Sequence, residues 1–183
     1  MDDIRQHPLW HLVQRAEQLM DRLEAILPQP MQAPDWAASV AFRYRKRSAH
    51  GLLEPVRHVA DLRLSDLQEI DEQKAKIQRN TERFVRGLPA NNVLLSGARG
   101  TGKSSLIKAC LNAYAEQGLR LIEVDKDDLT DLPDIVALVA QRPERFVVFC
   151  DDLSFEDGEG SYKALKSILD GTVAAATPNV LIY

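Results

Sequence analysis

The sequence has few cysteines, no long apolar run and no excess of positive charge, and each of these absences excludes a class of protein. Its two cysteines, Cys110 and Cys150, are too few for a disulfide framework and are expected to be reduced thiols in the cytosol. No apolar run approaches the ~20 residues of a membrane-spanning helix. The acidic start lacks the apolar stretch of a secretory signal. A formal net charge of −4 excludes a generally basic nucleic-acid binder.

The remaining composition is that of an ordinary globular protein. Hydrophobic residues make up 45% and charged residues 27% of the chain. A length of 183 residues allows one domain and an appendage. We expect an N-terminal helical and irregular segment over residues 1–63, followed by the main domain over residues 64–183.

The N-terminal segment contains one clear periodic pattern and one basic run. Residues 8–27 predict an amphipathic helix, because apolar residues recur in steps of four and three at Leu9, Val13, Ala16, Met20, Leu23 and Leu27. The helix either packs on its own domain or associates with a partner or a second copy. Residues 28–63 are expected to be irregular. Their basic run, 43–47, is a short strand, a phosphate-binding arm or a solvated charged face.

The rest of the chain alternates strands with helices, which predicts an α/β fold with a parallel sheet sandwiched by helices. Short apolar runs predict strands, and the segments between them have caps and glycines typical of helix ends. The expected helices are 66–86, 102–117, 133–141 and 161–170, and the expected strands are 93–95, 119–124, 146–150 and 180–183.

The segment after residue 95 carries the strongest chemical signal. It reads Gly97, Ala98, Arg99, Gly100, Thr101, Gly102, Lys103, Ser104 and matches the phosphate-loop pattern G-x-x-x-x-G-K-[S/T] at every fixed position. Glycines let successive N–H groups point into one concavity, and the following helix adds its positive end. We expect residues 97–105, which end with Ser105, to bind nucleotide phosphates. Lys103 is expected to reach the β- and γ-phosphates, and Ser104 to ligate Mg²⁺.

Two aspartates follow the apolar strand 146–150 and supply the carboxylates that such a loop needs. Asp151 is expected to hold Mg²⁺, and Asp152 to orient the attacking water, with Glu156 the next candidate for that role. A second acidic group follows the strand 119–124. Its members are better explained as helix caps and solvated side chains than as a metal site, and they are Asp125, Asp127, Asp128, Asp131 and Asp134.

Together, Gly97–Ser104 and Asp151–Asp152 resemble the Walker A and Walker B motifs of P-loop ATPases. The stretches 64–74, 80–84 and 89–95, with Cys150–Phe155, resemble a bacterial family of uncharacterised AAA-type ATP-binding proteins over roughly residues 36–183. The resemblance implies an oligomeric ATPase that uses ATP and Mg²⁺, with the segment 67–70 near the adenine. It also implies that the strand 180–183 lies between the strands 93–95 and 146–150.

The resemblance further implies a sensor residue, a fifth strand, an arginine finger and a helical lid beyond Tyr183, so that residues 64–183 are expected to be an incomplete AAA core. The chain is therefore expected to be a fragment that binds nucleotide, hydrolyses it weakly and tends to associate. A P-loop kinase and an interaction module with negligible turnover remain as alternative functions. A GTPase is disfavoured, because Asp125–Asp127 follows the second strand, too early for a guanine-reading motif. Neither nucleic acid nor a membrane is an expected partner, and the expected location is cytoplasmic.

Overall fold

The computed structural model describes residues 8–24, 31–47, 50–151, 153, 166 and 177–183. The chain divides into two compact units, Met1–Pro30 and Met31–Tyr183. The segment 31–63, assigned above to the N-terminal part, belongs to the second unit. None of the helices in these ranges combines the length and the apolar character needed to cross a membrane.

The first unit contains one helix, α1, which spans Pro8–Glu24. Its start agrees with the predicted helix 8–27, and residues 25–27 lie outside the described ranges. All α1 side chains that the structure describes are exposed, including Leu12 at 69%, Leu19 at 55% and Met20 at 61%. Within this unit, no other described element packs against the apolar stripe that the sequence predicts.

The second unit is built on a five-stranded sheet with the order β2-β1-β3-β4-β5. Among the described strands, β1 and β2 pair antiparallel, and the pairs β1–β3, β3–β4 and β4–β5 are parallel. The strands are β1 (Ala41–Arg47), β2 (His50–Pro55), β3 (Leu119–Glu123), β4 (Arg145–Phe149) and β5 (Val180–Ile182). The predicted mixed α/β architecture with a mainly parallel sheet is thus confirmed.

Strands β1 and β2 correct the prediction that residues 28–63 are irregular. They form a hairpin, and β1 extends the parallel sheet beside β3. Gly51 lies where a side chain does not fit, because a Cβ there would come within 2.7 Å of Tyr44 Cε2. The basic run 43–47 thus belongs to strand β1. The prolines on either side of it favoured an irregular segment in the sequence analysis.

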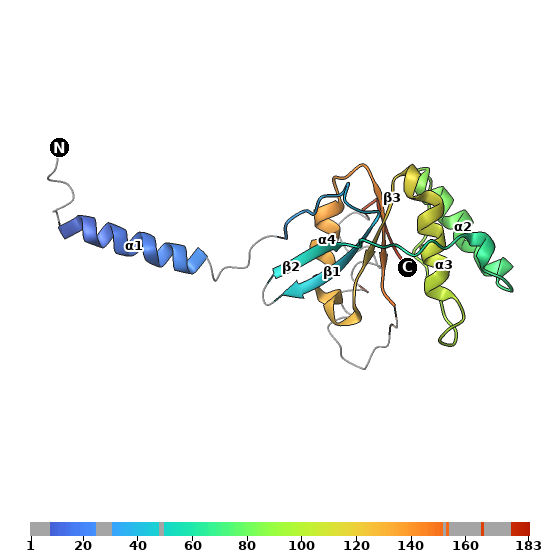
Figure 1. The fold of residues 1–183 in the computed structure, drawn as a ribbon. Helices are drawn as coiled ribbons and strands as arrows, with labels where there is room; N and C mark the ends of the chain where they lie inside the picture. Colours follow the sequence, from blue (N-terminus) through green and yellow to red (C-terminus); the bar gives the residue numbers. More distant parts are fainter. Residues whose placement is uncertain (1–7, 25–30, 48–49, 152, 154–165, 167–176) are drawn as a thin grey trace. The chain divides into compact units, whose positions relative to one another are not determined.

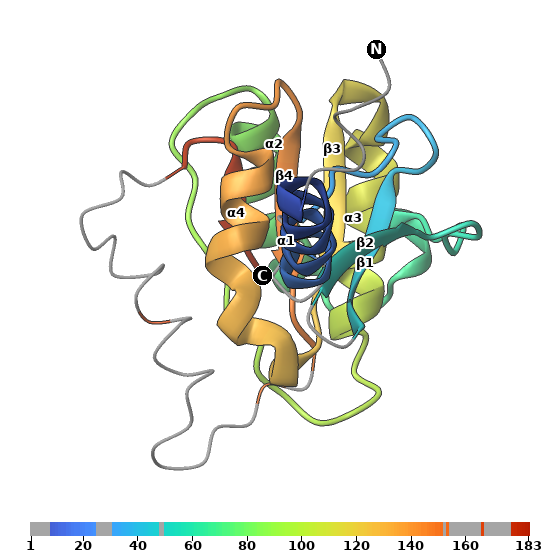
Figure 2. The ribbon, with the colours of Figure 1, turned by 90° about the vertical axis from the view of Figure 1, so that its left-hand side faces the viewer.

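Helices cover both faces of the sheet (Figures 1 and 2). Helix α4 (Leu132–Val139) lies on one face, and α2 (Asp71–Val85) and α3 (Lys103–Tyr114) lie on the other. The pleat directs alternate strand residues to opposite faces, as the two-residue period requires. On β4, Phe146 and Val148 belong to the core under α4, whereas Val147 and Phe149 belong to the core under α2 and α3.

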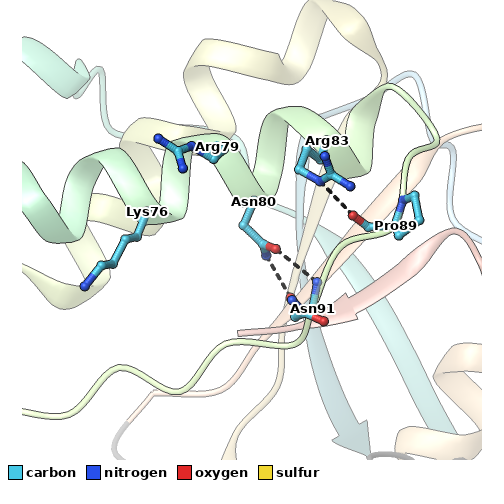
Figure 3. Close-up of a pocket in the computed structure, with 6 residues that line it drawn as sticks. All are labelled: Lys76, Arg79, Asn80, Arg83, Pro89 and Asn91. Carbon is cyan, nitrogen blue, oxygen red and sulfur yellow. Dashed lines mark hydrogen bonds between the residues drawn. The ribbon is translucent and has the colours of Figure 1, made fainter.

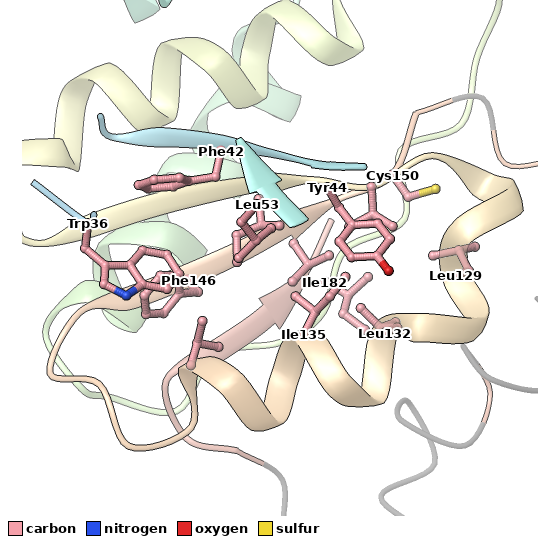
Figure 4. Packing of buried hydrophobic residues seen from close by; sticks show 14 residues of the cluster. Trp36, Phe42, Tyr44, Leu53, Leu129, Leu132, Ile135, Phe146, Cys150 and Ile182 are labelled. Atoms are coloured by element: carbon pink, nitrogen blue, oxygen red, sulfur yellow. The ribbon is translucent and has the colours of Figure 1, made fainter. Parts of the chain in front are cut away.

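The core under α4 is rich in aromatic side chains (Figure 4). The Trp36 ring meets Phe42 and Phe146 edge-on, with centroid distances of 4.8 and 5.0 Å. Such edge-to-face pairs add about 0.5–1.5 kcal/mol beyond burial of their area. Because Phe42 lies on β1, this core fixes the hairpin to the rest of the sheet.

The segment 93–95 is the main difference from the predicted secondary structure. It forms no regular strand, although Val93 N donates a 2.9 Å hydrogen bond to Ile182 O. This contact places it beside β5, so β5 separates it from β4, in the order that the resemblance implies. The predicted helix 161–170 lies outside the described residues except for Lys166.

Candidate functional site

The glycine-rich segment forms an exposed loop that leads directly into α3. Gly100 and Gly102 have φ values of 82° and 84°, a left-handed region that residues with a Cβ rarely adopt. Gly102 is the N-cap of α3, which begins at Lys103. The sequence therefore needs glycine here for backbone conformation, and the loop presents a helix N-terminus as phosphate-binding loops do.

The Lys103 side chain lies back across this loop. Its Nζ donates hydrogen bonds to Gly97 O at 2.9 Å and to Ala98 O at 2.8 Å. Thr101 Oγ1 also donates to Ala98 O, at 2.9 Å. These contacts hold the ammonium group within the curve of the loop, close to its backbone.

Ser104 and Asp151 meet although 47 positions separate them. The Ser104 hydroxyl donates a 2.6 Å hydrogen bond to Asp151 Oδ2. Ser104 lies in the first turn of α3, and Asp151 follows the carboxyl end of β4, where parallel α/β sheets bind ligands. The two candidate metal ligands that the sequence predicts are therefore adjacent, and Asp151 is exposed to solvent.

Two asparagines fix the segment that leads into the loop, and sequence reasoning gave them no role. Asn80 on α2 donates to Asn91 O at 2.7 Å and accepts from Asn91 N at 3.0 Å. Asn92 Oδ1 accepts a 2.8 Å hydrogen bond from Ile182 N. The Asn80 and Asn92 side chains thus bond to backbone groups where a regular strand would have bonded to its neighbour. The only signal in the sequence was that Asn92 directly precedes the apolar run 93–95.

Asn80 also joins a polar cluster at the end of the chain. Its Nδ2 donates to Tyr183 Oη at 3.0 Å, and that hydroxyl lies 2.9 Å from Thr81 Oγ1. Thr81 is fully buried and donates to Ile77 O. The cluster connects α2, the lead-in segment and the residue that follows β5.

The segment 67–70 lies beside the phosphate loop. A Cβ on Gly102 would be 3.9 Å from Ile70 Cδ1, and both Leu67 and Ile70 pack against the core under α2 and α3. Lys74 Nζ donates to Leu67 O at 2.8 Å and holds this turn. The segment expected near an adenine is thus close to the loop.

The two cysteines are buried and unreactive. Desolvation raises the pKa of Cys150 to about 12, with Asp125 and Asp151 adding repulsion. Desolvation also raises the pKa of Cys110 to about 11, against a hydrogen bond with Thr81. Both are neutral thiols at pH 7, consistent with the core role that the sequence predicts.

Acidic residues at the end of β3 and in the segment after it form ion pairs with the basic run of β1. Arg43 Nη2 lies 2.9 Å from Glu123 Oε2, and Lys46 Nζ lies 2.8 Å from Asp131 Oδ2. Among the described residues, no group of three or more His, Cys, Asp or Glu side chains is arranged to hold a metal ion. The basic run is thus a strand with ion pairs to the acidic segment.

Not every predicted site residue can be placed. The loop residues 97–105 and Asp151 are described, and Lys103, Ser104 and Asp151 lie together. Asp152 and Glu156, the two candidates for orienting water, lie outside the described residues.

Comparison with known proteins gives one match. No curated protein and no solved structure matches the chain. A family model matches residues 37–183, which include the whole sheet, the phosphate loop and Asp151. The chain therefore belongs to the family described as protein of unknown function (DUF815).

Proposed function

We propose that this chain binds ATP with Mg²⁺ and hydrolyses it, as the core of an AAA-type P-loop ATPase. The observation that carries the proposal is the 2.6 Å contact between Ser104 and Asp151. A serine after the loop lysine and an aspartate at the end of a buried strand are the protein ligands for Mg²⁺ in P-loop enzymes. The fold brings this pair together beside a loop with left-handed glycines.

The donor set fits Mg²⁺. Mg²⁺ takes oxygen ligands and is usually held by one or two carboxylates, with phosphate and water completing the octahedron. The Ser104 hydroxyl and the Asp151 carboxylate supply two oxygens at one place, and Asp151 is open to solvent. Bound there, the ion would neutralise charge on the β- and γ-phosphates.

The loop supplies the remaining binding groups. We expect its backbone N–H groups and the N-terminus of α3 to bind phosphate oxygens. When ATP binds, the Lys103 ammonium would give up its hydrogen bonds to the carbonyls of Gly97 and Ala98 and bond to the β- and γ-phosphates. Charged hydrogen bonds of this kind contribute about 1.5–3 kcal/mol each.

Hydrolysis requires a group that orients water towards the γ-phosphate. We assign this role to Asp152, because it follows the proposed metal ligand directly in sequence. The resemblance supports an active assembly of several copies. A cytoplasmic location is part of the same proposal and fits the two buried free thiols.

Titration calorimetry of the full chain with ATP and Mg²⁺ tests the proposal. Lys103→Ala should weaken ATP binding tenfold or more, since it removes a charged contact to the phosphates. Lys108→Ala, farther along α3, is the matched control and should retain the parental affinity. Equal ATP affinity for the Lys103→Ala variant and the parent would overturn the assignment of the loop.

A further inference from the structure

A polar pocket lies along α2, and none of the residues that line it belongs to the loop 97–105 (Figure 3). Its volume is about 390 Å³. The residues that line it are Lys76, Arg79, Asn80, Arg83, Pro89 and Asn91. Three of the six carry a positive charge, and the described residues that line it include no acidic side chain.

The cations lie on one side of the helix. The steps from Lys76 to Arg79 and from Arg79 to Arg83 are three and four residues, which places all three side chains on one face over roughly 10 Å. All three residues are exposed. Arg83 is oriented by its 2.9 Å hydrogen bond to Pro89 O. The pocket therefore combines an arginine that is bonded to the backbone with two further exposed cations.

The charge pattern limits the length of an anion that fits. Lys76 pairs with Glu72, and beyond Arg83 the next basic residue, Arg86, pairs with Glu82. These glutamates would repel a long polyanion along the helix. The pocket lining also has no aromatic side chain on which a nucleic-acid base could stack. A short acidic stretch suits this surface better than a nucleic-acid backbone.

An apolar residue accompanies the pocket. Leu88 precedes Pro89 in the chain and is 48% exposed. An apolar side chain open to water beside a charged pocket is typical of a protein contact, in which an apolar centre is framed by polar groups. The surface thus offers complementary sites for acidic and aliphatic side chains.

We propose that the α2 pocket docks a short acidic segment of a partner protein, with carboxylates at Lys76, Arg79 and Arg83 and an aliphatic side chain at Leu88. The segment belongs to another protein and needs no nucleotide for binding. The site is distinct from the phosphate loop.

Fluorescence anisotropy with the full chain tests this docking. The probe is a labelled ten-residue peptide of glutamates around a central leucine. The peptide should bind the parent, and Lys76→Glu/Arg79→Glu should weaken binding at least tenfold. Arg57→Glu, which reverses an exposed charge outside the pocket, should change the affinity less than twofold. Higher salt should weaken peptide binding, because exposed charges are screened.

Further measurements make the result decisive. Circular dichroism and retained ATP affinity should show that the double variant is folded, and Lys76→Gln/Arg79→Gln provides a milder pair if it is not. Equal peptide affinity in parent and variants would overturn the proposal. It would also be overturned if a ten-nucleotide thymidine oligomer bound more tightly than the peptide. Self-association abolished by the double variant would instead assign the surface to a second copy and likewise overturn it.

Discussion

Tyr44 on β1 donates a 2.8 Å hydrogen bond to Asp131, 87 positions later, at the N-cap of α4. Lys46 donates to the same carboxylate at 3.1 Å. The Asp131 carboxylate thus links the β1–β2 hairpin to α4. The Tyr44 ring is almost fully buried, so its hydroxyl needs this acceptor.

This anchor predicts that stability falls in acid through Asp131. Desolvation alone would raise the pKa of Asp131, but hydrogen bonds from Lys46 and Tyr44 outweigh it and lower the pKa below its usual 3.8. A lowered folded-state pKa stabilises the protein above the unfolded value and loses that contribution as pH falls through the folded value. Asp131→Asn should therefore lower stability at pH 7, and the difference from the parent should shrink as the pH falls below 3.8.

Urea denaturation at several pH values measures this difference. Glu116→Gln removes an exposed carboxylate after α3 and is the matched control, expected to change stability little at any pH. A loss for Asp131→Asn that is as large at pH 3 as at pH 7 would contradict the assigned linkage.

Asn80 is expected to support both stability and nucleotide binding. Asn80→Ala removes the two hydrogen bonds to the Asn91 backbone and the contact with Tyr183. We expect a loss of about 0.5–1.5 kcal/mol, because two of these contacts are exposed and only the contact with Tyr183 is partly buried. Because Asn80 fixes the segment 91–95 that leads into the loop 97–105, its loss should also weaken ATP binding.

Thermal denaturation and titration calorimetry measure the two effects of Asn80→Ala. Gln117→Ala removes an exposed side-chain amide from the short helical turn after α3, at the end of that helix away from the loop, and should leave both quantities unchanged. Parental stability in Asn80→Ala would show that the Asn80 amide does not fix the segment before the loop.

Asp151 and Asp152 are expected to act in different steps. Asp151→Asn should weaken the Mg²⁺-dependent part of ATP binding, since it removes a negative ligand beside Ser104. Asp152→Asn should leave binding intact and slow turnover, because it changes the group that orients water. Binding titrations with and without Mg²⁺, together with steady-state ATPase assays, distinguish the two variants. Parental turnover by Asp152→Asn would move the water-orienting role to another residue, with Glu156 next.

The exposed stripe of α1 is expected to mediate association with a partner helix or a second copy. Large exposed apolar patches mark interaction sites, and Leu19 widens the stripe next to Met20. Leu19→Glu in the full chain should reduce self-association, measured by light scattering over a range of concentrations. Gln18→Glu adds the same charge off the stripe and should have no such effect. A parent that stays monomeric at all concentrations would exclude a second copy and leave a different protein or the chain's own second unit as the occupant.

The sequence alone determined the features that depend on local pattern. The apolar run before Asp151 predicted the buried strand β4, and Gly87 and Gly118 correctly marked the ends of α2 and of the helical segment after α3, with φ values of 73° and 92°. The glycine-rich motif 97–104 was recognisable for the same reason, because Gly100 and Gly102 meet a backbone requirement that does not depend on the rest of the fold.

Only the tertiary structure decided which distant groups meet. The strand β1 was not predictable with certainty, because its basic side chains are stabilised by Glu123 and Asp131, and these partners come from across the fold. Residues 93–95 have the composition of a strand but form no regular strand. The Asn80 and Asn92 side-chain amides bond instead to the backbone of Asn91 and of Ile182. Pairing between segments far apart in the chain depends on sheet order and packing, and no local sequence pattern encodes that order or that packing.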